Sequence, residues 1–62
     1  MIRRYLAMYD DGHDYGSFTF ESVHRAGSKA NKEDARSAAL RILGYDRARR
    51  IKITKIERYE VC

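Results

Sequence analysis

The sequence predicts a two-layer α+β domain of β-β-α-β order, in which a three-stranded antiparallel sheet carries one helix on one face. Two segments of alternating apolar residues flank a stretch rich in aspartate and glycine, a stretch with helical periodicity ends at Gly44, and an isoleucine-rich segment follows. These patterns are typical of a β-hairpin, an amphipathic helix and a third strand. Because 62 residues are too few for two cores, we expect residues 1–62 to form a single domain.

The first strand is expected at Ile2–Tyr9, where side chains alternate between two faces. One face carries the aliphatic side chains of Ile2, Leu6 and Met8, and we predict that this face packs under the helix. The other face would then be open, and it carries Arg3, Tyr5 and Tyr9.

A hairpin is predicted over residues 10–16, which hold three aspartates and two glycines. Glycine accepts positive φ, and aspartate bonds its own backbone in tight turns. The second strand then spans Ser17–His24, with Phe18 and Phe20 directed toward the core.

The helix is predicted at Lys32–Leu43, with Asn31 as its N-cap, Glu33 in its first turn and Gly44 as the residue that ends it. One face of this helix is apolar and consists of Ala35, Ala38, Ala39, Ile42 and Leu43. We expect Ile42 and Phe20 to be buried at the centre of the core.

The third strand is predicted at Ile51–Val61, next to the first strand, so that the spatial order is 2-1-3. In a regular strand, Ile51 and Ile53 would face the same side of the sheet and Ile56 would face the other. A β-bulge near Thr54–Lys55 would bring all three isoleucines to the core side.

Composition excludes several classes of protein. The chain has one cysteine, Cys62, and two histidines, so the sequence offers no intramolecular disulfide and no zinc-binding pattern. No apolar run approaches the roughly 18 residues of a membrane span. We expect a cytoplasmic protein that has no cofactor and no contact with a membrane.

No residue pattern indicates catalysis. Asp10, Asp11, His13 and Asp14 cluster in the predicted hairpin, but aspartate and glycine are what such turns favour for backbone reasons. Gly27-Ser28-Lys29 lacks the rest of a phosphate-binding loop, and we interpret it as a connector. We therefore expect a protein that is not an enzyme.

The net charge of +4 lies entirely in the C-terminal half, because residues 31–62 hold nine Lys or Arg against five Asp or Glu. The candidate contacts to nucleic acid or another polyanion are Arg47, Arg49, Arg50, Lys52 and Lys55. On the open face, Arg3, Tyr5 and Tyr9 are candidates for a protein interface or for base stacking. The favoured hypothesis is an accessory domain that binds a protein or a second copy of itself, and the alternative is a nucleic-acid-binding module that uses residues 47–58 and the open face.

Two runs carry a resemblance. YDDGHDYGSFTFES, at residues 9–22, and HRAGSKANKEDA, at residues 24–35, are similar to small proteins of bacterial prophages and conjugative elements. The resemblance implies a mobile-element origin and no particular activity.

Overall fold

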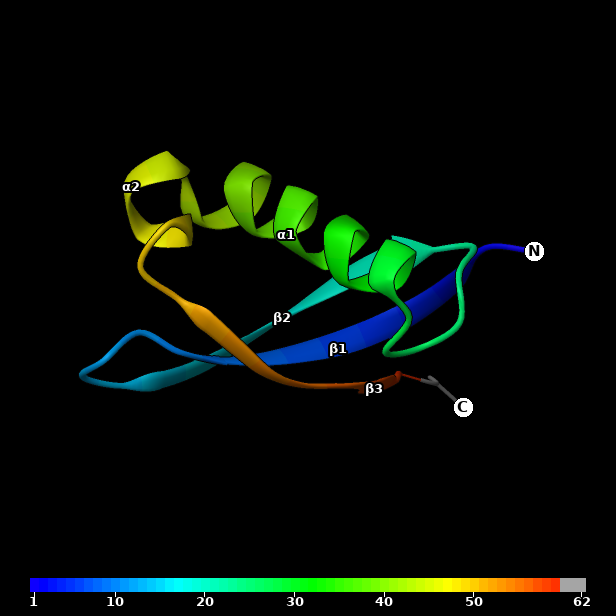
Figure 1. The fold of residues 1–62 in the computed structure, drawn as a ribbon, viewed down its shortest axis with the longest axis horizontal. Coiled ribbons are helices and arrows are strands. Elements are labelled where there is room, and N and C mark those ends of the chain that lie inside the picture. The colour runs from blue at the N-terminus through cyan, green and yellow to red at the C-terminus, as the bar shows by residue number, and fades with distance from the viewer. Residues whose placement is uncertain (60–62) are drawn as a thin grey trace.

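Three antiparallel strands form a sheet in the order β2-β1-β3, and two helices lie over one face of it (Figure 1). The computed structural model describes residues 1–59. The elements are β1 (Arg3–Asp10), β2 (Tyr15–Ser22), α1 (Lys29–Leu43), α2 (Tyr45–Ala48) and β3 (Lys52–Arg58). The predicted α+β class and strand order are confirmed, and α2 is an addition that the sequence did not predict.

The hairpin between β1 and β2 is organised by its own aspartates. Asp11 Oδ1 accepts hydrogen bonds from the backbone N–H groups of His13 and Asp14, at 2.9 and 2.7 Å, and Asp10 Oδ1 accepts one from Gly12 N–H. Gly12 has a φ of 95°, in the left-handed region that favours glycine. The turn chemistry predicted for this stretch is thus what the structure shows.

The face assigned to the first strand was wrong. Tyr5 and Tyr9 lie under the helix and are only 2% and 7% exposed, whereas Met8 is exposed on the other face and Leu6 is half-buried. The physical reason is volume. The underside of α1 is lined with alanines, which supply little bulk, so large rings from the sheet must fill the space between the layers.

Aromatic rings from both hairpin strands form the centre of the core. Tyr5 stacks against Phe20 with ring centroids 5.6 Å apart, and Tyr9 packs at 6.0 Å from Phe18. Gly16 lies opposite Tyr9 in the ladder, and a Cβ at Gly16 would collide with the Tyr9 ring. The burial predicted for Phe18 and Phe20 is confirmed, and Gly16 leaves the space that Tyr9 occupies.

Helix α1 begins earlier than predicted, because Ser28 and not Asn31 is the N-cap. Ser28 Oγ accepts a hydrogen bond from Asn31 N–H at 3.2 Å. Asn31 is fully buried, and its side-chain amide makes two hydrogen bonds to the loop before α1. Its Oδ1 accepts from Gly27 N–H, and its Nδ2 donates to the His24 carbonyl. Since the helix starts at Lys29, Glu33 also lies beyond the first turn.

The end of α1 matches the prediction, but the burial expected of Ile42 near that end does not. Gly44 ends the helix with a φ of 88°, and its N–H donates to the Leu40 carbonyl. Ile42, predicted to be buried, is 50% exposed. Figure 1 shows why: α1 is inclined to the strands, and its C-terminal end lies farther from them. Ala48 and Ile51, which follow in and after α2, are buried here instead.

The predicted bulge in the third strand is confirmed. In the pairing of β1 with β3, Met8 is opposite Lys55 and Tyr9 is opposite Ile53, so Thr54 is skipped. The shift puts Ile53 and Ile56 on the helix side, where both pack against the core. β3 ends at Arg58, and the part of the predicted strand beyond residue 59 lies outside the described residues. No helix within residues 1–59 is long and apolar enough to span a membrane.

Candidate functional site: the groove between α1 and β3

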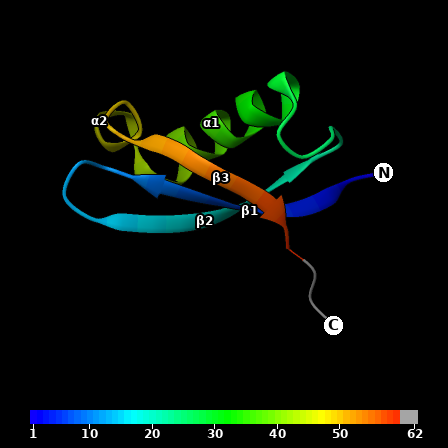
Figure 2. The same cartoon turned by 60° about the horizontal axis from the view of Figure 1, so that its bottom comes forward.

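Helix α1 does not lie centrally over the sheet. It packs closely against β2, and Ser22 Oγ of that strand donates a 2.6 Å hydrogen bond to Asp34 Oδ2 of the helix. β3 is the outer strand on the other side of β1 (Figure 2). The helix therefore leaves the β3 side of the core partly uncovered.

A groove of about 390 Å³ occupies this uncovered side. Its apolar lining comes from Ile51, which is buried, and from the half-buried side chains of Ile53 and Ile56. The remaining lining residues are Gly27, Thr54 and four basic residues. Lys32 and Arg36 come from α1, and Lys52 and Lys55 come from β3.

Within residues 1–59, the charged side chains that line the groove are all basic. Among these four basic residues, only Lys55 has a carboxylate of residues 1–59 within 4.0 Å. Its Nζ lies 3.5 Å from Glu57 Oε2, and the two side chains are 62% and 43% exposed. Arg36 Nη1 donates a long hydrogen bond of 3.5 Å to the Ile51 carbonyl, which turns the guanidinium toward β3. The groove thus combines an apolar floor with a basic rim.

The outer edge of β3 runs along the groove. Within residues 1–59 this strand pairs only with β1, so its other edge is free to accept another strand. Lysines on an edge discourage pairing with neutral or basic strands. Lys52 and Lys55 therefore disfavour pairing of this edge with a second copy of β3.

The outer edge of β2 is less accessible. Pairing two copies of β2 would bring two copies of α1 over strands only about 4.8 Å apart, whereas packed helices need about 8–10 Å between their axes. Self-association through the edge of β2 would therefore require α1 to move.

The structure divides the five basic residues that the sequence grouped together. Lys52 and Lys55 line the groove. Arg47 and Arg50 line a separate pocket near the hairpin, and Arg49 caps the C-terminal end of α2.

The sequence did not predict Lys32 and Arg36 as site residues. Their i,i+4 spacing on a helix, flanking an alanine face, is the signal that could have found them.

The aromatic platform predicted on the open face is absent. Tyr5 and Tyr9 are core residues, and the Tyr5 hydroxyl donates a 2.9 Å hydrogen bond to the His24 carbonyl. Arg3 is exposed at the start of β1, so it does not share an exposed surface with these two buried tyrosines. The open face instead presents Leu6 and Met8 on its central strand, with polar residues on β2 beside them.

Two further results bear on function. Within the described part of the chain, no group of three or more His, Cys, Asp or Glu side chains is placed to hold a metal ion. No family model, curated protein sequence or solved structure matches the chain.

Proposed function

We propose that this domain is a non-enzymatic protein-interaction module, and that the α1–β3 groove receives an extended, acidic segment of a partner protein. The observation that carries the proposal is the coincidence of an edge strand with a groove whose floor is apolar and whose charged lining residues, within residues 1–59, are all basic. The partner segment would pair with β3 as a fourth strand, a recurring mode of peptide recognition. The cytoplasmic setting expected from the sequence belongs to the same proposal.

The geometry defines the side chains that such a segment needs. Successive residues of a strand point to opposite faces, so every second residue of the added strand would face α1. Apolar residues at these positions would cover Ile53 and Ile56, and acidic residues near them would reach Lys32 and Arg36. β3 has seven residues, so a segment of similar length would fill the edge.

A protein segment is favoured over nucleic acid as the ligand of the groove, because the groove offers no aromatic rings within residues 1–59. Binding of single strands depends on aromatic side chains on which bases stack. In the part of the chain that the structure describes, no aromatic side chain lines this groove, and Tyr5 and Tyr9 are buried. Main-chain pairing along β3 needs no such rings.

The test uses fluorescein-labelled heptapeptides whose α1-facing row carries two isoleucines flanked by two glutamates, with threonine at the positions between. We expect saturable binding by fluorescence anisotropy, and amide shifts along β3 in NMR spectra. A peptide with lysine in place of glutamate should not bind, because its charges repel those of the rim. An acidic peptide with a central proline should bind poorly, because it lacks a ladder donor.

Charge reversal in the protein supplies the matched control. Lys32→Glu with Arg36→Glu should weaken binding of the acidic peptide by about tenfold or more. Arg41→Glu changes an exposed arginine of the same helix that does not line the groove, and it should have little effect. Equal losses in the two proteins would refute the groove, and tighter binding of single-stranded oligonucleotides through the groove would favour the alternative function.

A further inference from the structure

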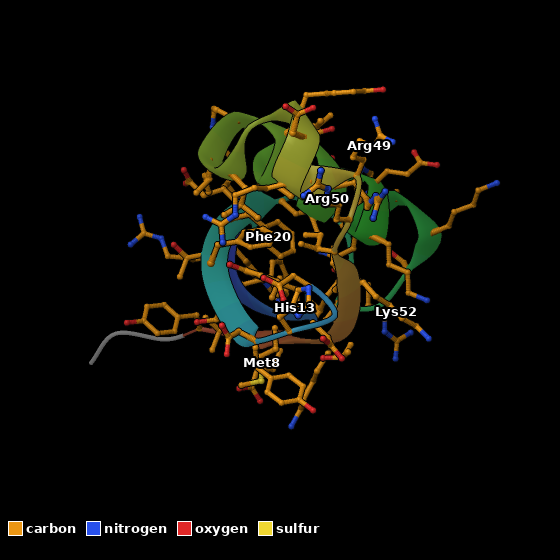
Figure 3. All side chains as sticks on the ribbon, turned by 90° about the vertical axis from the view of Figure 1, so that its left-hand side faces the viewer. Met8, His13, Phe20, Arg49, Arg50 and Lys52 are labelled. Atoms are coloured by element: carbon orange, nitrogen blue, oxygen red, sulfur yellow. The ribbon has the colours of Figure 1, made fainter. Side chains whose placement is uncertain are left out.

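A second basic site lies at the far end of the domain, where the hairpin tip meets α2. A pocket of about 170 Å³ is lined there by Asp11 and His13 from the hairpin and by Arg47 and Arg50 from α2 and the residues after it. Figure 3 looks onto this end, with His13 and Arg50 both labelled on it. None of these residues lines the α1–β3 groove.

Both walls of the pocket are held by hydrogen bonds and packing. On the hairpin side, Asp11 N–H donates to the Asp14 carbonyl at 3.1 Å, and Asp11 Oδ1 fixes the backbone of His13. On the other side, Ala48 is buried and anchors α2, while Arg50 N–H donates to the Arg47 carbonyl at 3.0 Å. The side chains thus project from backbone whose position is set by the fold.

Positive charge exceeds negative charge in this pocket. Two guanidinium groups face one carboxylate, and no ion pair within 4.0 Å joins Asp11 to either arginine. Hydrogen bonds from the backbone of Asp14 and His13, and more weakly the charges of His13 and Arg47, lower the pKa of Asp11, so this carboxylate is ionised at neutral pH. The pocket keeps a net charge of about +1 even when His13 is neutral.

We propose that this pocket binds a phosphate-type oxyanion, with Arg47 and Arg50 as the main donors and the His13 imidazole as a third. Guanidinium groups present paired donors that match the oxygens of a phosphate. Each water in the liquid occupies about 30 Å³, so a volume of 170 Å³ has room for the five heavy atoms of a phosphate group. The Asp11 carboxylate repels a bound anion, so removing its negative charge should strengthen phosphate binding.

The experiment is an NMR titration of the protein with inorganic phosphate, with sodium chloride adjusted to hold ionic strength and pH constant. We expect saturable shifts of the His13 ring resonances. Arg47→Gln with Arg50→Gln should weaken binding by about tenfold or more, which corresponds to at least one charge-assisted contact. Arg41→Gln removes an exposed arginine outside the pocket and should leave the titration unchanged.

Asp11→Asn is the variant that separates a site from a merely basic surface. Its amide oxygen can still accept from the His13 and Asp14 N–H groups, so the turn is preserved while the opposing charge is lost. We expect phosphate to bind more tightly to this variant. An absence of His13 shifts at tens of millimolar phosphate, or shifts that persist in the double arginine variant, would overturn the proposal.

The source of the phosphate is distinguished by competition. A single-stranded oligonucleotide that displaces inorganic phosphate from the pocket at far lower concentration would assign the site to a nucleic-acid backbone. A mononucleotide that displaces it while the oligonucleotide does not would assign the site to a small phosphorylated molecule. Because the readout is the His13 ring, which lines the pocket and not the groove, failure here leaves the proposed peptide binding untouched.

Discussion

Removing the amide of Asn31 should destabilise the domain more than removing the helix cap itself. The side chain is fully buried and joins the start of α1 to the loop that follows β2. Its Oδ1 accepts a 3.2 Å hydrogen bond from Gly27 N–H, and its Nδ2 donates a 3.3 Å bond to the His24 carbonyl. In Asn31→Ala both bonds are lost, while the backbone N–H of residue 31 can still donate to Ser28 Oγ.

The magnitude follows from these two bonds. Each hydrogen bond contributes about 0.5–1.5 kcal/mol net. In the variant the His24 carbonyl keeps the Tyr5 hydroxyl as a donor, and Gly27 is exposed, so water can reach its N–H. We therefore expect a loss of about 1–3 kcal/mol for the two bonds, a large share of the roughly 5 kcal/mol at the low end of domain stability.

Urea unfolding followed by far-ultraviolet circular dichroism measures the loss, since the chain contains no tryptophan. Ser28→Ala is the matched control, because it removes the N-cap oxygen and should cost only about 1 kcal/mol. Hydrogen exchange at Gly27 N–H should accelerate in Asn31→Ala. A loss below about 1 kcal/mol for Asn31→Ala, or one no larger than that of Ser28→Ala, would refute this account of the buried amide.

Three further outcomes are expected. Phe20→Ala should cost about 3–5 kcal/mol in urea unfolding, since the ring is 3% exposed and stacked on Tyr5; an unchanged melting temperature would contradict the core assignment. Gly16→Ala should cost about 1–3 kcal/mol, because its methyl group meets the packed ring of Tyr9, and relief of that cost by a smaller residue at position 9 checks the cause. The pKa of Asp11 is lowered from its ordinary 3.8, so its stabilisation is present above about pH 4 and is lost as pH falls through the folded-state pKa; the melting temperatures of the wild type and Asp11→Ala should converge only in acid.

The elements of the fold could be predicted from the sequence because each has a local signal. Gly44 ends the helix, aspartates close the hairpin through their own backbone, and the mismatched parity of Ile53 and Ile56 requires a bulge. These features depend on neighbouring residues alone. Short-range chemistry therefore located the helix end, the hairpin and the bulge, whereas the strand order followed from packing one helix on a three-stranded sheet.

The faces of β1 could not be predicted in the same way. Both parities of this strand carry apolar side chains, so hydrophobicity does not choose between Tyr5 with Tyr9 and Leu6 with Met8. The choice depends on volume across the layers, because the alanine face of α1 needs large rings opposite it. Gly16 was the available clue, since a glycine opposite an aromatic residue provides room for its ring.

The start of α1 and the residues of the groove could not be predicted, for a related reason. Both Ser28 and Asn31 are good N-cap residues, and burial of Asn31 in a loop contact decides between them. The groove depends on which side of the sheet α1 covers, which no single segment encodes. Lys32 and Arg36 belong to the site only because the helix packs toward β2.

The basic C-terminal half is therefore two surfaces rather than one. Lys52 and Lys55 act with the helix at the edge of β3, whereas Arg47 and Arg50 act with the hairpin at the end of the domain. Two separate ligands would make the effects of groove and pocket substitutions independent. A single long polyanion that crossed both surfaces would couple them, so that combined substitutions in one protein deviate from the sum of the separate losses by more than about 0.5 kcal/mol. Net charge alone cannot distinguish these cases, but the combined variant can.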